Sequence, residues 1–188
     1  MKIHQLQASY QIEQDRVLVR LNTHSGEEVR LWLTRRLTKN LFPHIFKAAA
    51  ALTDAPTQLI SHDGADPLAL TQFRMQESIQ QADFSTPFVN EAPVLPMGHA
   101  PLLATTVQIT PVDGGNLRIG FEEQIPDTAG VRSFEITLDP PLLHAFTHLL
   151  QLALKNSDWG IVPDQLALSN DTPALDAFGA AEPPKYLN

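Results

Sequence analysis

Polar and apolar residues alternate with a period of two through the first fifty residues of this 188-residue chain, a pattern typical of half-buried strands. Apolar side chains occupy every second position in three runs, at 6–12, 17–21 and 29–33. Short polar or turn-forming stretches separate these runs, and strands joined by such short connections pair antiparallel. We therefore expect three antiparallel strands.

A helix should follow the third strand directly. Thr34 is a suitable N-cap, and apolar residues then recur at helical spacing through residues 37–49. Pro43 lies inside this stretch and lacks a backbone N–H, so it predicts either a kink or a later helix start near Asn40.

The same order of elements recurs in residues 102–160. Alternating runs come before a second helix, for which Asp139 is the expected N-cap and Pro140 the first helical residue. Aligning Leu33 with Leu138 puts Thr34 on Asp139 and brings the apolar positions of the two helices into register. We therefore predict an α+β fold of duplicated βββα units with pseudo-twofold symmetry, built from one or two antiparallel sheets with the helices packed on one side.

One compact domain is expected, with four segments. The first βββα unit spans 1–52 and the second spans 102–160, while 161–188 form an acidic tail. Residues 53–101 connect the units through a helix predicted near 66–81 and a proline-rich strap. A strand is the alternative to that helix, because Phe73, Met75 and Ile79 share parity. Four prolines among residues 87–101, with apolar residues between them, favour an extended strap on the protein's own surface. The PxxP pattern at 93–96 leaves the alternative of a ligand for a proline-reading domain.

Composition excludes several classes of site. The chain has no cysteine, so disulfides, cysteine-ligated zinc and a cysteine nucleophile are excluded. No apolar run approaches the roughly 20 residues that cross a bilayer, and the first residues lack the apolar stretch of a secretory signal. We expect a cytoplasmic protein with no membrane partner.

The net charge of −8 is unevenly distributed. Residues 1–50 carry eight basic and four acidic side chains, a net +4, whereas the other 138 residues carry five basic and 17 acidic side chains, a net −12. This asymmetry allows either neutralisation within the chain or head-to-tail self-association.

The candidate site is the outward side of the two strands predicted around 17–21 and 29–33. If their alternating apolar residues face the core, Arg20 lies opposite Arg30 and Leu18 lies opposite Trp32. Like charges directly across a ladder are unfavourable, so we expect an acidic group between or over the two arginines. Its candidate sources are the acidic remainder of the chain, a second subunit or a nucleic-acid phosphate.

Two functions follow from this surface. The first is a non-catalytic interaction protein, an adaptor or accessory factor that is oligomeric and binds a protein partner or itself. The alternative is single-stranded nucleic-acid binding, because arginines beside an aromatic residue on a sheet can stack and neutralise a strand. The candidate binding residues are Arg16, Leu18, Arg20, Arg30, Trp32, Arg35 and Arg36.

Catalytic and cofactor signatures are missing. The sequence has no GxGxxG, GxxxxGK[ST], GxSxG or HExxH motif, so we predict neither an enzyme nor a cofactor. His144 and His148 share a helical face, as helix-borne metal ligands do. However, Ala145 stands where a zinc protease has its glutamate, and no third ligand is marked, so no metal is predicted.

Overall fold

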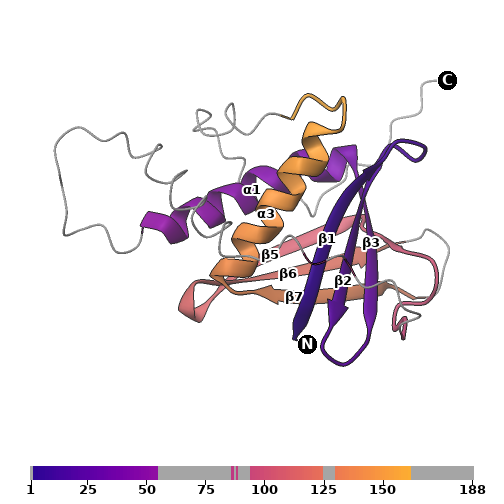
Figure 1. Cartoon of the computed structure of the whole chain (residues 1–188), viewed down its shortest axis with the longest axis horizontal. Coiled ribbons are helices and arrows are strands. Elements are labelled where there is room, and N and C mark those ends of the chain that lie inside the picture. Colours follow the sequence, from indigo (N-terminus) through magenta and orange to yellow (C-terminus); the bar gives the residue numbers. More distant parts are fainter. Residues whose placement is uncertain (1, 55–85, 87, 89–93, 125–129, 162–188) are drawn as a thin grey trace, which may run out of the picture.

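The computed structural model describes residues 2–54, 86, 88, 94–124 and 130–161, and these form an α+β fold with two antiparallel-rich sheets and two α-helices (Figure 1). The strands of the two sheets run across one another, and the two helices cross where they are in contact. In chain order the elements are β1 (Ile3–Gln11), β2 (Arg16–Thr23), β3 (Glu28–Thr34), α1 (Arg35–Asp54), β4 (Leu102–Leu103), β5 (Thr106–Val112), the 3-10 turn η2 (Asp113–Gly115), β6 (Asn116–Glu123), β7 (Arg132–Leu138) and α3 (Pro140–Lys155).

The first sheet has the order β1-β2-β3-β4. Strands β1, β2 and β3 pair antiparallel, with Leu18 opposite Trp32 and Arg20 opposite Arg30, as the alternation predicts. Strand β4 joins β3 in the parallel direction beside Trp32. The inward side chains of β2 and β3 are all buried: Val17, Val19, Leu21, Val29, Leu31 and Leu33. Their burial fixes the register, because a one-residue slip would turn every one of them outward.

The second sheet has the order β5-β6-β7, with both pairs antiparallel. The turn η2 connects its first two strands, where Gly114 and Gly115 adopt φ of 77° and 75°. Side chains other than glycine rarely adopt this conformation, so the glycine pair makes the tight connection possible. The inward residues Ile119 and Phe121 are fully buried.

Helix α1 begins at Arg35, directly after β3. The Oγ1 atom of Thr34 accepts a hydrogen bond from the Leu37 N–H at 3.3 Å, so the expected cap is present. The alternative of a start near Asn40 is wrong, because Pro43 lies inside a continuous helix. Proline removes one helical hydrogen bond, and the buried apolar stripe of this helix compensates for that loss.

Helix α3 matches its prediction closely. Asp139 caps it by accepting a hydrogen bond from the Leu142 N–H at 3.0 Å, Pro140 is its first residue, and it ends at Lys155. The helix lies alongside β1 and packs against α1 (Figure 1). Between the helices, the buried His144 Nε2 lies 3.0 Å from the carbonyl oxygen of Ala49.

One apolar cluster contains the inward residues of both sheets and the buried faces of both helices. Trp159, just beyond α3, joins this cluster, and its indole Nε1 donates to Asp15 at 2.5 Å. The hydroxyl of Tyr10 donates to the same carboxylate oxygen at 2.8 Å. The turn between β1 and β2 is therefore attached to the segment that follows α3.

The described part of the predicted strap runs along both sheets. Val94 pairs with the start of β3, where its carbonyl accepts from the Glu28 N–H at 2.8 Å. The guanidinium of Arg132 in β7 donates to the carbonyl oxygens of Met97, Ala100 and Pro101. The backbone carbonyl groups of this segment therefore hold it against the sheets, through the Glu28 N–H and the Arg132 guanidinium.

Several predictions lie outside the described residues. They are the helix near 66–81, most of the strap before Val94 and the tail from residue 162 onward. Within the part that the structure describes, neither helix is long and apolar enough to span a membrane.

Candidate functional site

The site is the outward face, which we define as the side chains of β1, β2 and β3 that point away from the apolar core. Strand β1 contributes glutamine and serine, β2 contributes two arginines around a leucine, and β3 contributes an acid, an arginine and a tryptophan. The members are Gln5, Gln7, Ser9, Gln11, Arg16, Leu18, Arg20, Asn22, Glu28, Arg30, Trp32 and Thr34.

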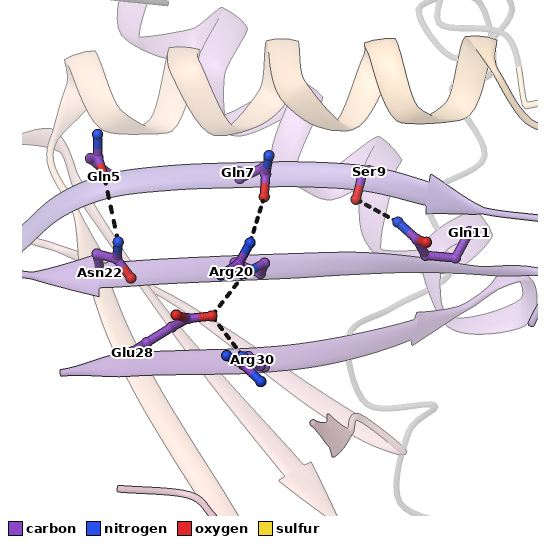
Figure 2. A network of polar contacts seen from close by, with 8 residues as sticks. All are labelled: Gln5, Gln7, Ser9, Gln11, Arg20, Asn22, Glu28 and Arg30. Carbon is purple, nitrogen blue, oxygen red and sulfur yellow. Dashed lines mark hydrogen bonds and ion pairs between the residues drawn. The ribbon is translucent and has the colours of Figure 1, made fainter. Parts of the chain in front are cut away.

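A buried carboxylate separates the two arginines that face each other. The side chain of Glu28 has no exposed surface, and its Oε1 atom accepts from the Nε atoms of Arg20 and Arg30, both at 2.7 Å. Figure 2 shows this carboxylate between the two guanidinium groups. The expected acidic group is therefore present.

The expected source of that acid is wrong. It comes neither from the acidic remainder of the chain nor from a subunit or a phosphate, but from β3 itself. Glu28 precedes Arg30 by two residues, so both side chains point to the same side of the strand. The glutamate side chain is long enough to reach both Arg30 on its own strand and Arg20 on β2. The sequence carried this signal, because the register that puts Arg20 opposite Arg30 also puts Glu28 opposite Asn22 on the same side.

The ion cluster keeps Glu28 ionised. Burial raises the pKa of the Glu28 carboxyl, but hydrogen bonds and charges from Arg20 and Arg30 outweigh burial and hold the pKa below its ordinary value. Its second oxygen, Oε2, is buried without a hydrogen-bond partner among the described residues. Two guanidinium groups and one carboxylate leave a net charge of +1.

Arg20 is enclosed by its neighbours. Its Nη1 atom donates to the Gln7 side chain at 3.4 Å, and its guanidinium lies 4.3 Å from the ring centroid of Phe88. Only 17% of its side chain is exposed. A cation held between a carboxylate and an aromatic ring is an internal contact, so Arg20 contributes mainly to the structure of the face.

Arg30 is the more accessible member of the cluster. Its side chain is 30% exposed, and its Nε atom is directed at Glu28. The terminal nitrogens of Arg30 make no hydrogen bond to any residue that the structure describes. Beside it lie the half-buried Trp32 and Leu18, followed by the half-buried Arg16, which forms no ion pair within the described chain. Two available cations therefore flank an apolar pair.

Arg35 and Arg36 do not belong to this face. Both are exposed in the first turn of α1, and Arg35 donates to the carbonyl oxygen of Trp159 at 3.3 Å. The structure thus brings five of the seven predicted residues together on one side of a sheet and places the other two on a helix. Glu28, Gln7 and Phe88 are the contributors that sequence reasoning missed.

The two histidines on α3 have different surroundings. A carbonyl oxygen only accepts, so His144 Nε2 must carry a proton to bond Ala49, and that nitrogen has no lone pair for a metal. Burial lowers the pKa of His148. Among the described residues, no group of three histidine or acidic side chains is arranged to hold a metal ion.

Comparison of the sequence with protein-family models and curated proteins, and of the structure with solved structures, gives no match. The geometry of the outward face therefore carries the functional argument.

Proposed function

We propose that this chain is a non-catalytic cytoplasmic interaction protein, an adaptor or accessory factor, and that its outward face docks a protein surface. The observation that carries the proposal is the apolar pair Trp32 and Leu18 between the cations Arg16 and Arg30. Tryptophan and arginine are the residue types that contribute most often to binding hot spots. A sheet surface of this composition suits another protein.

The fixed position of Arg30 supports the same proposal. An arginine that must be ordered on binding costs about 0.5–1.5 kcal/mol of side-chain entropy. Here Glu28 already holds the Nε end of the guanidinium at 2.7 Å, so part of that ordering is complete before a partner arrives. Docking is therefore favoured by preorganisation.

Nucleic-acid binding is the alternative, and the cluster weakens it. Arg20 is engaged by Glu28, Gln7 and Phe88, which leaves Arg30 and Arg16 as the accessible cations of the face. Binding to nucleic acid draws most of its affinity from several neutralised phosphates. A net charge of −8 also opposes approach to a polyanion.

Duplication of a βββα unit with approximate twofold symmetry is part of this proposal. It is supported by the repeated order of three antiparallel strands and a capped helix, with Thr34 and Asp139 in matching positions. In the second unit the positions that correspond to the binding row of β3 are Ser133, Glu135 and Thr137, all exposed. Strand β7 therefore has no aromatic or cationic side chain at the positions that correspond to Arg30 and Trp32.

The absence of native cysteine allows a direct test by site-specific photo-crosslinking. Ser9→Cys places a single thiol beside Leu18 on the outward face, and Ser133→Cys places one on the exposed side of β7 as the matched control. Each thiol is alkylated with benzophenone maleimide, whose ketone inserts into a C–H bond of a neighbouring molecule on irradiation. We expect the Ser9→Cys protein to give one discrete adduct, with a second copy or with another protein, that is lost when Trp32→Ala is added. Equal adducts from both positions, or none from Ser9→Cys, would refute docking through this face.

Analytical ultracentrifugation separates the two kinds of partner. A second copy as partner requires the purified chain to sediment as a dimer or larger assembly at micromolar concentration, and Trp32→Ala to shift it towards the monomer. A monomeric chain whose Ser9→Cys adduct contains another protein identifies a heterologous partner. Trp32 points away from the core, so its replacement should leave the fold intact, which circular dichroism checks.

A further inference from the structure

The available charges on the outward face follow a regular spacing along the strands. Arg30 and Trp32 are two residues apart on β3, while Leu18 and Arg16 are two residues apart on β2. Because Leu18 lies opposite Trp32, the order along the sheet is cation, apolar pair, cation. Each step of two residues covers about 6.6–6.8 Å, so the two cations are roughly 13 Å apart along the strand direction.

The chemistry of Arg30 selects the group it can take. With Nε donating to Glu28, the two terminal nitrogens remain as a planar fork, and such a fork binds a carboxylate or a phosphate through two parallel hydrogen bonds. The excess charge of the cluster, +1 from two guanidinium groups and one carboxylate, favours an anion at this position.

From these features we infer that the outward face binds an extended acidic protein segment in which two carboxylate side chains flank an apolar one at alternate positions. In an extended segment, residues i, i+2 and i+4 point to the same side and span about the same 13 Å. One carboxylate meets the Arg30 fork, the apolar side chain packs on Trp32 and Leu18, and the second carboxylate meets Arg16. This inference rests on the proposed docking function and names the chemistry of the partner.

The apolar pair Trp32 and Leu18 favours a protein carboxylate over a nucleic-acid phosphate as the ligand. Trp32 is half-buried and flanked by β4, so it offers a base less ring surface for stacking than a fully exposed tryptophan would. Nucleotide stacking needs an accessible aromatic face. A branched aliphatic side chain needs only the shallow apolar surface that Trp32 and Leu18 provide together.

Three synthetic probes test the inference by nuclear magnetic resonance. The first peptide, acetyl-Glu-Ser-Leu-Ser-Glu-amide, has the predicted pattern. The second, acetyl-Ser-Glu-Leu-Glu-Ser-amide, has the same composition, but its acids point to the side opposite the leucine when extended. The third probe is a single-stranded oligothymidine. The indole signal of Trp32 reports binding, and that of the buried Trp159, which is bonded to Asp15, is the internal reference.

We expect the first peptide to shift the Trp32 signal and the second to bind at least about tenfold more weakly. Arg30→Gln should weaken the first peptide about tenfold, which corresponds to the loss of a charge-assisted hydrogen bond at a partly exposed site. Arg30→Lys should recover little of that loss, because lysine keeps the charge but lacks the fork. The charge-matched control is Arg118→Gln, on the exposed side of β6, which should leave binding unchanged.

Equal binding of the two peptides, an equal loss in Arg118→Gln and Arg30→Gln, or stronger Arg30-dependent binding of the oligothymidine would overturn the inference. Crosslinking distinguishes this failure from failure of the docking function itself. If the Ser9→Cys adduct forms and depends on Trp32 while the first peptide does not bind, the face docks a protein of other chemistry. If both experiments fail, the docking function is refuted as well.

Discussion

Replacing Glu28 by glutamine removes the charge that holds Arg20 and Arg30 together while nearly preserving the volume of the side chain. The carboxylate is fully buried and accepts two charge-assisted hydrogen bonds at 2.7 Å. Removing one partner of a buried ion pair costs about 3–5 kcal/mol. The exposed fractions of the two arginines, 17% and 30%, let water take over part of the solvation, and the glutamine oxygen still accepts. We therefore expect Glu28→Gln to lower the free energy of unfolding by about 3 kcal/mol.

Urea denaturation followed by circular dichroism measures this loss, with an unchanged m-value as the condition for comparing midpoints. For a chain of this size, about 3 kcal/mol corresponds to a melting temperature roughly 6–12 °C lower. The matched control is Glu27→Gln, one residue earlier, where the carboxylate accepts only an exposed hydrogen bond from Ser25 at 2.9 Å. That variant should lose less than about 1 kcal/mol. If the two variants lose the same amount, the cluster does not organise the outward face.

Three further predictions concern other contacts. The pKa of Glu28 is lower in the folded state than in the unfolded state, where it is 4.5. Its contribution to the free energy of unfolding is therefore complete above pH 4.5 and is lost as the pH falls through the folded-state pKa. In urea titrations at successively lower pH, the difference in stability between wild type and Glu28→Gln should close. Arg132→Ala leaves the mostly buried Glu123 carboxylate without its ion pair and frees the carbonyls at 97–101, so it should cost about 2 kcal/mol and speed proteolysis there, whereas Arg118→Ala, which breaks an exposed pair, should cost under about 0.5 kcal/mol. Asp15→Asn tolerates the positive φ of 49° but removes the charged acceptor, so the indole signal of Trp159 should move upfield while that of Trp32 stays in place; movement of both would mean a global change.

Local patterns predict much of this fold because their causes are local. The register of β2 and β3 follows from two apolar stripes that must face the same side. The caps Thr34 and Asp139 follow from single hydrogen bonds to nearby N–H groups. The alternative of a late start of α1 was wrong. Proline disfavours a helix locally, but burial of the apolar side of α1 against distant residues outweighs this effect.

Contacts between distant segments could not be predicted in this way. Phe88 over Arg20, Val94 beside Glu28 and Trp159 on Asp15 join residues separated by long stretches of chain. No periodicity relates such pairs, because three-dimensional packing alone brings them together. Glu28 is a different case: its position on the outward face was predictable from parity, but its placement between the Arg20 and Arg30 guanidinium groups depends on side-chain conformations that parity does not specify.

The cost of burying Glu28 gives a reason to regard the cluster as functional. Replacing a buried ion group by apolar residues of similar volume is often neutral or stabilising, so stability alone does not explain an acid between two arginines. An apolar replacement would pack the two strands equally well but would leave no fixed guanidinium at the surface. The arrangement in Figure 2 gives Arg30 a defined orientation at its Nε end and keeps its terminal nitrogens available. An oriented cation beside Trp32 provides geometric selectivity for a carboxylate, which a mobile surface lysine would lack.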